Sequence, residues 1–183
     1  MSQARLDQLS QIEAAVWREL AQAVGRKPHA WRVAVLATVA SDAADARSVV
    51  LRDFEAQTRT LLIYTDSRSP KATQVAAHPA GTLVLWSPEL SWQLRLKVTL
   101  TLQTSGLQVS SRWARLKLTP AAQDYLSPLP PGTPLASLAP VRQSREHFAV
   151  LEAQIVSVDW LELHASGHRR ARFDAAGAVW LTP

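Results

Sequence analysis

The sequence predicts a mainly β fold, a small antiparallel barrel with peripheral helices. Short apolar runs recur along the chain between short polar linkers, a pattern typical of antiparallel neighbours. Residues 92–104 alternate strictly between apolar and polar side chains, which indicates a sheet with one polar face. Repeated β-α-β alternation is absent, so a doubly wound parallel sheet is disfavoured. The length of 183 residues and the hydrophobic content of 47% predict one domain, residues 1–183.

The first half of the chain is predicted to form two helices and four strands. Leu9, Ile12 and Val16 recur at helical spacing, so residues 6–24 form a helix within an N-terminal segment, 1–28. Ser69 followed by Pro70 predicts the start of the second helix, because Ser is favoured at the N-cap and Pro at the first helical position. The strands, each an apolar run, are predicted at 31–40, 46–54, 60–65 and 81–86.

The second half begins with the alternating strand 92–104 and continues with a predicted helix, 110–126, that contains a second cap at Thr119-Pro120. Six of the 11 Pro residues fall between positions 120 and 140, which predicts an ordered Pro-rich loop there. The remaining predicted elements are a helix at 142–153 and strands at 155–163, 169–174 and 178–182.

The charged residues favour a phosphate-bearing partner. Of the 20 basic residues 16 are Arg, whose planar fork binds phosphate oxygens in pairs. Nucleic acid, a nucleotide and a phosphorylated cofactor all satisfy this preference. Glycine-rich phosphate loops are absent, so the contacts must come from side chains on strands and helix starts.

Several other classes are excluded or disfavoured. The absence of Cys excludes disulfides, thiolate metal sites and a Cys nucleophile, and the five His residues are not at metal-ligand spacings. No apolar run is long enough to span a membrane, and the acidic residues near the N-terminus are unlike a signal peptide. We therefore expect a cytoplasmic protein with no metal site and no membrane partner.

Two segments combine strand ends with anion-binding chemistry. In the strand at 46–54, Arg47 and Arg52 point to opposite faces because side chains alternate. In residues 64–71 a strand ends in hydroxyls and leads into a helix start. Lys71 has the wrong sign for that end of the helix dipole, which is favourable where an anion binds. Solvated strand charges and a simple capped helix explain these segments equally well.

Three further segments carry polar groups suited to a ligand. Gln93 lies on the polar face of the alternating strand, and its amide both donates and accepts, as the edge of a heterocycle requires. Residues 142–145 form a polar turn, and residues 164–172 concentrate basic side chains into a dense anion site. An exposed hairpin or a nucleic-acid contact are alternatives for the last segment. Its basic residues are not arranged on a helix, so we expect no nucleic-acid partner.

Taken in order, these segments resemble the pyridoxamine 5′-phosphate oxidase family over about residues 30–183. The resemblance rests on the series RSVVLR, IYTDSRSPKA, HPAGTLVLW, WQLR, RQS, HRRARF and a terminal WLTP. It implies an antiparallel split β-barrel that binds FMN, a homodimer with FMN at the subunit interface, and oxidoreductase activity on a small molecule. An alternative on the same fold is a non-catalytic flavin- or haem-binding protein with His164 as the axial ligand.

The resemblance also implies functional residues. Arg52 and Gln93 would be the catalytic groups beside the flavin ring, and Gln143 and Ser144 would reach FMN from the partner subunit. The implied cofactor contacts are Arg47, Ser48, Val49, Val50, Leu51, Arg52, Tyr64, Thr65, Ser69, Lys71, Gln93, Gln143, Ser144, His164 and Arg172. The implied substrate contacts are Arg52, Tyr125, Thr133, His168 and Arg170.

The sequence departs from the family pattern mainly on the substrate side. Pro70 and Leu129 occupy positions where the family has Arg, and His164 occupies the position of a Trp. His168 and Arg170 replace the family's substrate-binding Arg and His. We therefore expect FMN to be the cofactor but pyridoxamine 5′-phosphate not to be the substrate.

Overall fold

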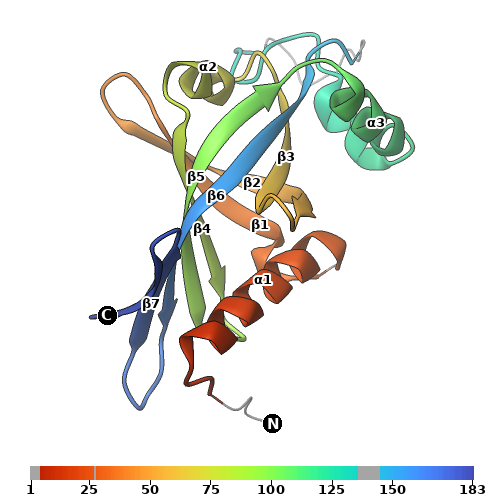
Figure 1. The fold of residues 1–183 in the computed structure, drawn as a ribbon. Coiled ribbons are helices and arrows are strands. Elements are labelled where there is room, and N and C mark those ends of the chain that lie inside the picture. The colour runs from red at the N-terminus through yellow and green to blue at the C-terminus, as the bar shows by residue number, and fades with distance from the viewer. Residues whose placement is uncertain (1–4, 27, 136–144) are drawn as a thin grey trace.

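The computed structural model describes residues 5–26, 28–135 and 145–183. Within these ranges eight strands form one antiparallel sheet in the order β3-β2-β1-β4-β5-β6-β7-β8. An additional pairing of β3 with β6 closes six of these strands into a barrel (Figure 1). The strands are β1 (Val33–Val39), β2 (Ala44–Glu55), β3 (Thr60–Asp66), β4 (Ala80–Ser87), β5 (Trp92–Gln103), β6 (Phe148–Glu162), β7 (Arg169–Asp174) and β8 (Gly177–Leu181). The predicted mainly β antiparallel barrel with peripheral helices is confirmed.

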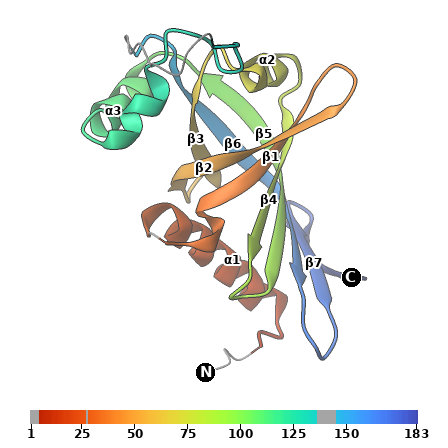
Figure 2. The ribbon, with the colours of Figure 1, turned by 180° about the vertical axis from the view of Figure 1, so that it is seen from behind.

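Strand β6 links the barrel to a two-stranded extension. Its first half pairs with β3, its second half pairs with β7, and β5 runs along its other edge. The helices lie at the two ends of this arrangement: α1 (Leu9–Gly25) lies at one end and α2 (Pro70–Ala77) and α3 (Leu107–Leu116) at the other (Figures 1 and 2). None of the helices in the described part of the chain is long and apolar enough to cross a membrane.

The main core follows the alternation seen in the sequence. On β5, Leu94, Leu96 and Val98 are buried in the barrel, whereas the residues between them face outward. Helix α1 covers one end of this core with Ile12, Val16, Leu20 and two alanines. Burying each of its three large aliphatic side chains contributes about 1.5–3 kcal/mol to the stability of the folded protein. This burial keeps α1 packed over the end of the barrel.

A second, smaller core lies on the outer face of β3. Leu61 and Ile63 point into the barrel, whereas Leu62 points outward and packs with Trp113 of α3 and Phe148 of β6. The short 3-10 helix η2 (Pro120–Tyr125) completes this second core. Consecutive residues of one strand thus serve two cores, because strand side chains alternate between faces.

Three predicted elements need correction. The predicted helix 110–126 is two elements, α3 and η2, because Pro120 has no N–H to continue a helix and begins a new one. The loop predicted at 120–140 consequently starts only after Tyr125. The predicted helix 142–153 is wrong where it is described: residues 145–147 form a turn, and residues 148–153 form the first part of β6. Its Ala, Leu and Glu residues favour a helix locally, but pairing with β3 and β5 on both sides overrides that preference.

Candidate functional site

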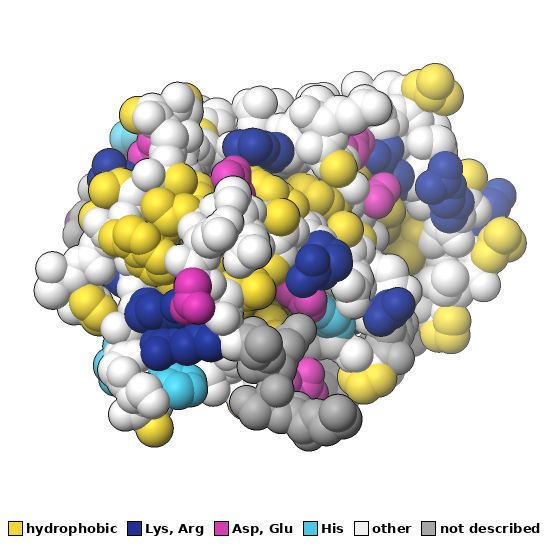
Figure 3. All heavy atoms as spheres, turned by 60° about the horizontal axis from the view of Figure 1, so that its bottom comes forward, with side chains coloured by type: hydrophobic (Ala, Val, Ile, Leu, Met, Phe, Trp, Pro, Cys, Tyr) yellow, Lys and Arg dark blue, Asp and Glu magenta, His cyan; other side chains and the backbone are white. Residues whose placement is uncertain are grey.

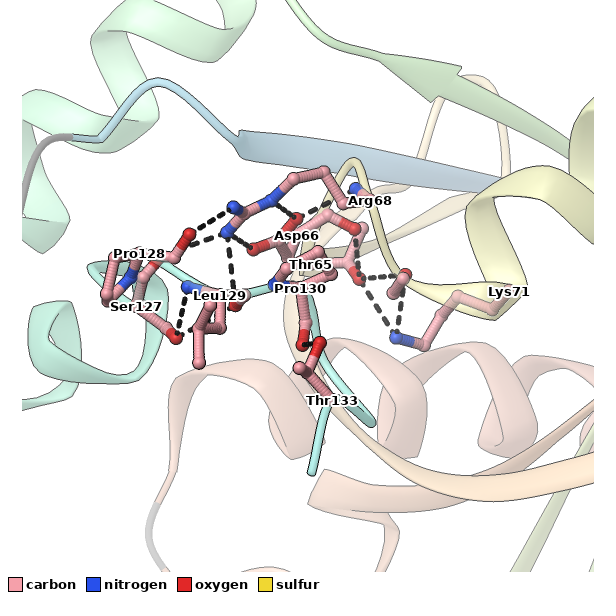
Figure 4. A network of polar contacts seen from close by, with 10 residues as sticks. Thr65, Asp66, Arg68, Lys71, Ser127, Pro128, Leu129, Pro130 and Thr133 are labelled. Carbon is pink, nitrogen blue, oxygen red and sulfur yellow. Dashed lines mark hydrogen bonds and ion pairs between the residues drawn. The ribbon is translucent and has the colours of Figure 1, made fainter. Parts of the chain in front are cut away.

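The turn between β3 and α2 brings a lysine and two hydroxyls together; we refer to Lys71, Ser69 and Thr65 as the Lys71 cluster. Lys71 Nζ donates to Thr65 Oγ1 at 2.9 Å and to Ser69 Oγ at 3.3 Å (Figure 4). Ser69 is only 1% exposed. Although it occupies the N-cap position, its side chain makes no capping hydrogen bond and contacts Lys71 instead.

The charge of Lys71 is not neutralised by protein groups. No carboxylate of the described residues lies within 4 Å of its Nζ. Burial lowers the pKa of Lys71, and the positive charge of Arg47 lowers it further. A half-buried cation held beside another cation is unfavourable by itself, and an anion bound here would remove both penalties.

Arg47 lies near this cluster but is held by its own partners. It points inward from β2 and donates to the Thr38 hydroxyl at 2.6 Å, to Gln74 Oε1 at 3.0 Å and to the Asp45 carboxylate. The hydrogen bond from Gln74, followed by the contacts with Arg47, lowers the pKa of Asp45. Sequence reasoning missed Asp45 and Gln74, because nothing local indicates that α2 packs over the start of β2.

Arg52 points to the opposite face of β2, as the alternation predicts. Its Nη2 donates to the Tyr125 hydroxyl at 3.2 Å, and its guanidinium carbon lies 5.7 Å from the centre of the Tyr64 ring. The rings of Tyr64, Tyr125 and Phe148 contact one another edge to face. Arg52 is half-buried, its Nε has no hydrogen-bond partner, and no carboxylate of the described residues lies within 4 Å of its guanidinium. It is therefore a second cation without a counter-ion, set against an aromatic wall.

A different group of predicted residues lies at the far end of β6. The register pairs Gln93 with Leu161 and Arg95 with Asp159, and on the other side of β6 it pairs Leu161 with Arg170 and Asp159 with Arg172. These side chains share one outward face. Here the basic groups are neutralised: Arg170 donates to both oxygens of Asp159, at 3.0 and 2.6 Å, and Arg172 pairs with Asp174 at 2.9 Å. Figure 3 shows this end of the molecule, where basic and acidic side chains lie next to one another.

The two predicted histidines lie in the exposed turn between β6 and β7. The Ser166 N–H donates to His164 Nδ1 at 3.0 Å, and the His164 N–H donates to His168 Nδ1 at 3.1 Å. An imidazole that accepts at Nδ1 carries its proton on Nε2 when neutral, so Nε2 is not available as a metal ligand in this arrangement. His164 borders a cavity of about 780 Å³ together with Arg5, Leu90 and Trp92.

The predicted cofactor residues thus form two groups at opposite ends of one strand. Thr65 pairs with Ala149 near the start of β6, whereas Gln93 pairs with Leu161 near its end. Positions 149 and 161 are 12 residues apart, roughly 35–40 Å along a strand. One flavin mononucleotide cannot contact both groups within a single chain.

An exposed apolar strip lies on the outer face of β1 and β4. Its residues are Val33, Val35, Val39, Val84 and Trp86; Val35 is 42% and Trp86 43% exposed. Val35 pairs with Val84 on one side and with Ser48 on the other, and Val33 pairs with Val50. The outward residues of the predicted cofactor strand therefore border this strip.

The remaining predicted residues have varied positions. Val49 and Leu51 are buried in the barrel core, so only their backbone is available to a ligand. Thr133 is exposed in the loop after η2 and donates to the Pro130 carbonyl at 2.8 Å. Gln143 and Ser144 lie outside the described residues.

Comparisons with known proteins agree with this architecture. The family model described as pyridoxamine 5′-phosphate oxidase, FMN-binding domain, matches residues 14–104. The chain is 27% identical over 184 residues to the pyridoxine/pyridoxamine 5′-phosphate oxidase of Caulobacter vibrioides, which covers 92% of this chain and 82% of that protein.

Two solved structures are similar over almost the whole chain. A pyridoxamine 5′-phosphate oxidase-related, FMN-binding protein of Nostoc punctiforme has a TM-score of 0.75 at 25% identity, covering 93% of this chain and 96% of that one. PhzG of Burkholderia lata has a TM-score of 0.75 at 15% identity, covering 94% and 92%. At that lower identity the likeness to PhzG indicates a shared fold.

Proposed function

The chain belongs to the pyridoxamine 5′-phosphate oxidase-like family of FMN-binding split-barrel proteins, and on this premise we propose that it is an FMN-dependent oxidoreductase. The observation that carries the proposal is the pair of half-buried cations, Lys71 and Arg52, that lack a carboxylate partner among the described residues. FMN has a phosphate, which would pair with Lys71, and an electron-accepting ring, which would lie beside Arg52.

The Lys71 cluster fits the phosphate of FMN. Lys71 supplies a positive charge, and the hydroxyls of Ser69 and Thr65 accept hydrogen bonds from its Nζ, which holds the ammonium group at the start of α2. Phosphate binding would restore the ordinary ionisation of Lys71, whose pKa is lowered in the free protein. Arg47 lies near this cluster and adds positive potential, and its guanidinium is hydrogen-bonded to Asp45 and Gln74.

Arg52 and Tyr64 fit the neighbourhood of the flavin ring. When bound, the flavin supplies the redox chemistry by accepting a hydride from the substrate. Arg52 would hold a positive charge beside the ring, and such a charge favours reduction of the ring. The aromatic wall of Tyr64, Tyr125 and Phe148 would exclude water from that side.

A second copy of the chain would complete the site. Gln93, His164 and Arg172 lie at the far end of β6, too far from the Lys71 cluster to meet the same FMN within one chain, so a partner would deliver them. The family resemblance assigns Gln143 and Ser144, which lie outside the described residues, to the partner as well. The apolar strip on β1 and β4 supports a two-fold interface, because such an interface buries the same patch of both copies. We accordingly propose a homodimer with FMN at its interface.

The substrate is proposed to be a small molecule other than pyridoxamine 5′-phosphate. Leu129 offers no positive charge at the position where the family has Arg, and Arg170 is already paired with Asp159. Loss of a buried Arg–phosphate contact costs roughly 2–5 kcal/mol of binding free energy. That loss would make a phosphorylated substrate a poor ligand, while Arg52, Tyr125, Thr133 and His168 remain available to a different one.

The proposal is tested by flavin binding. We expect the purified protein to retain FMN through gel filtration and to show the flavin absorbance band. Lys71→Ala removes a charged contact with the phosphate, so FMN should bind about 10- to 100-fold more weakly, whereas riboflavin, which has no phosphate, should bind unchanged. Lys117→Ala, an exposed lysine at the end of α3, is the matched control. Wild-type protein that fails to bind FMN would refute the proposed function.

A further inference from the structure

Arg68 has the most extensive set of hydrogen bonds around the Lys71 cluster, yet family resemblance assigns it no role. It lies in the turn between β3 and α2, between Asp66 and Ser69. Its Nε donates to Asp66 Oδ1 at 3.1 Å and its Nη2 to Asp66 Oδ2 at 2.7 Å. Its backbone N–H donates to the same carboxylate at 2.8 Å. Asp66 therefore fixes the direction in which the guanidinium points.

The other edge of the guanidinium binds the loop after η2. Arg68 Nη1 donates to the Pro128 carbonyl at 2.9 Å, and Nη2 donates to the carbonyls of Ser127 at 2.9 Å and Leu129 at 3.4 Å (Figure 4). Three successive carbonyl groups thus converge on one cation. A planar fork with several fixed N–H groups is needed for this arrangement, and the single ammonium of a lysine cannot reproduce it.

The loop held by Arg68 carries its own turn structure. The Leu129 N–H donates to Ser127 Oγ at 3.2 Å, and the Thr133 hydroxyl donates to the Pro130 carbonyl at 2.8 Å. In the part of the chain that the structure describes, every hydrogen bond found between residues 127–135 and the rest of the protein comes from Arg68. Among the described residues, Arg68 thus provides the hydrogen bonds that tie the loop to the rest of the protein.

The loop is also uncharged. Residues 126–141 contain no Asp, Glu, Lys, Arg or His. Arg68, which touches the described part of it, pairs its charge with Asp66 and donates to the three carbonyls. Leu129 is 41% exposed. A ligand next to this loop would meet an apolar side chain and the Thr133 hydroxyl rather than a charge.

We propose that Arg68 is a positioning residue that fixes residues 127–133 beside the Lys71 cluster as a preformed, uncharged wall of the substrate site. This inference rests on the proposed FMN site, because the same turn carries Ser69 and Lys71 on one side and Arg68 on the other. Phosphate bound to the Lys71 cluster orders that turn, and Arg68 transmits the order to the loop. The substrate end that meets this wall is apolar or neutral rather than phosphorylated.

Hydrogen–deuterium exchange of a peptide covering residues 126–135 tests the inference. In Arg68→Lys the charge beside Asp66 is kept but the fork is lost, so we expect exchange of this peptide to rise about tenfold in the FMN-free protein. FMN should slow exchange of the loop in the wild type but not in the variant, while both bind FMN with the same affinity. Riboflavin should leave the loop unprotected. Arg59→Lys, an exposed arginine paired with Glu13, is the matched control.

The outcomes separate this inference from the proposed function. Unchanged loop exchange in Arg68→Lys, or equal protection by riboflavin and FMN, would overturn the positioning role. If no variant binds FMN, the proposed function fails, but the exchange rates of the free proteins still decide whether Arg68 holds the loop. A lower melting temperature in Arg68→Lys with uniform loss of protection would indicate general destabilisation and also overturn the inference.

Discussion

Basic side chains lie at both ends of β6, but among the described residues they are paired with carboxylates mainly at one end. At the β3–α2 end, Lys71 and Arg52 are half-buried without a carboxylate within 4 Å among the described residues. At the β6–β7 end, Arg169, Arg170 and Arg172 each pair with a carboxylate, provided by Glu162, Asp159 and Asp174. We therefore base the proposed anion site on the absence of a counter-charge among the described residues, and not on the density of basic residues.

At the β6–β7 end, the surroundings of Glu162 favour its ionised form. Burial of Glu162 opposes its ionisation, but hydrogen bonds from Arg169 and Arg5 outweigh burial and lower its pKa. Arg169 also packs against the rings of Trp160 and Trp180. The dense basic motif at residues 164–172, which suggested an anion site in the sequence, is in this chain largely a set of structural ion pairs.

The largest effect is expected when the two ends are prevented from meeting across the proposed dimer. Val35→Asp places a charge in the middle of the apolar strip, and burying an unpaired carboxylate is highly unfavourable. We expect the variant to be monomeric by light scattering and to bind FMN at least about 100-fold more weakly, because half of the site is lost. Leu118→Asp, at an exposed position near α3, should remain dimeric and bind FMN normally. A dimeric Val35→Asp protein would contradict the proposed interface.

The second prediction is that removing the charge of Asp159 allows the β6–β7 end to bind an anion. Asp159→Asn keeps the side-chain shape but removes the charge that Arg170 and Arg95 share. We expect a stability loss of about 1 kcal/mol, because these groups are partly exposed. Pyridoxamine 5′-phosphate should bind the FMN-loaded variant about tenfold more tightly in calorimetry. Asp42→Asn, in the exposed β1–β2 turn, controls for net charge, and equal gains in both variants would mean that Asp159 has no specific role.

The third and smallest effect concerns pH at the other end. Burial, followed by the charge of Arg47, lowers the pKa of Lys71, so the free protein loses this charge at a lower pH than an exposed lysine would. FMN affinity should therefore fall as the pH rises through that depressed pKa. The unfolded chain keeps the proton to higher pH, so this group makes the unfolding free energy of the free protein rise over the same window.

FMN titrations between about pH 7 and pH 10 measure this effect. Lys71→Arg is the matched variant, because a guanidinium stays protonated throughout the range. We expect its FMN affinity to change less with pH than that of the wild type. The same pH dependence in both proteins would assign the titration to another group.

Much of the fold could be predicted because its causes are local. The period-two pattern of residues 92–104 is β5 almost to the residue, and Ser69-Pro70 marks the start of α2. The helix predicted at 142–153 failed for the opposite reason: β6 is a strand because β3 and β5 pair with it, and both partners are distant in the sequence.

For the candidate site, the sequence alone indicates which residues share a strand, a turn or a face. It separated Arg47 from Arg52 and grouped Ser69 with Lys71, because side-chain alternation and helix starts are set by neighbouring residues. Which charges are neutralised follows only from the tertiary structure: Asp45 and Gln74 hold Arg47, Asp159 holds Arg170, and no described carboxylate lies within 4 Å of Lys71 or Arg52. Ion pairs depend on which distant strands become neighbours, and the closure of the barrel by β3 and β6 sets those neighbours.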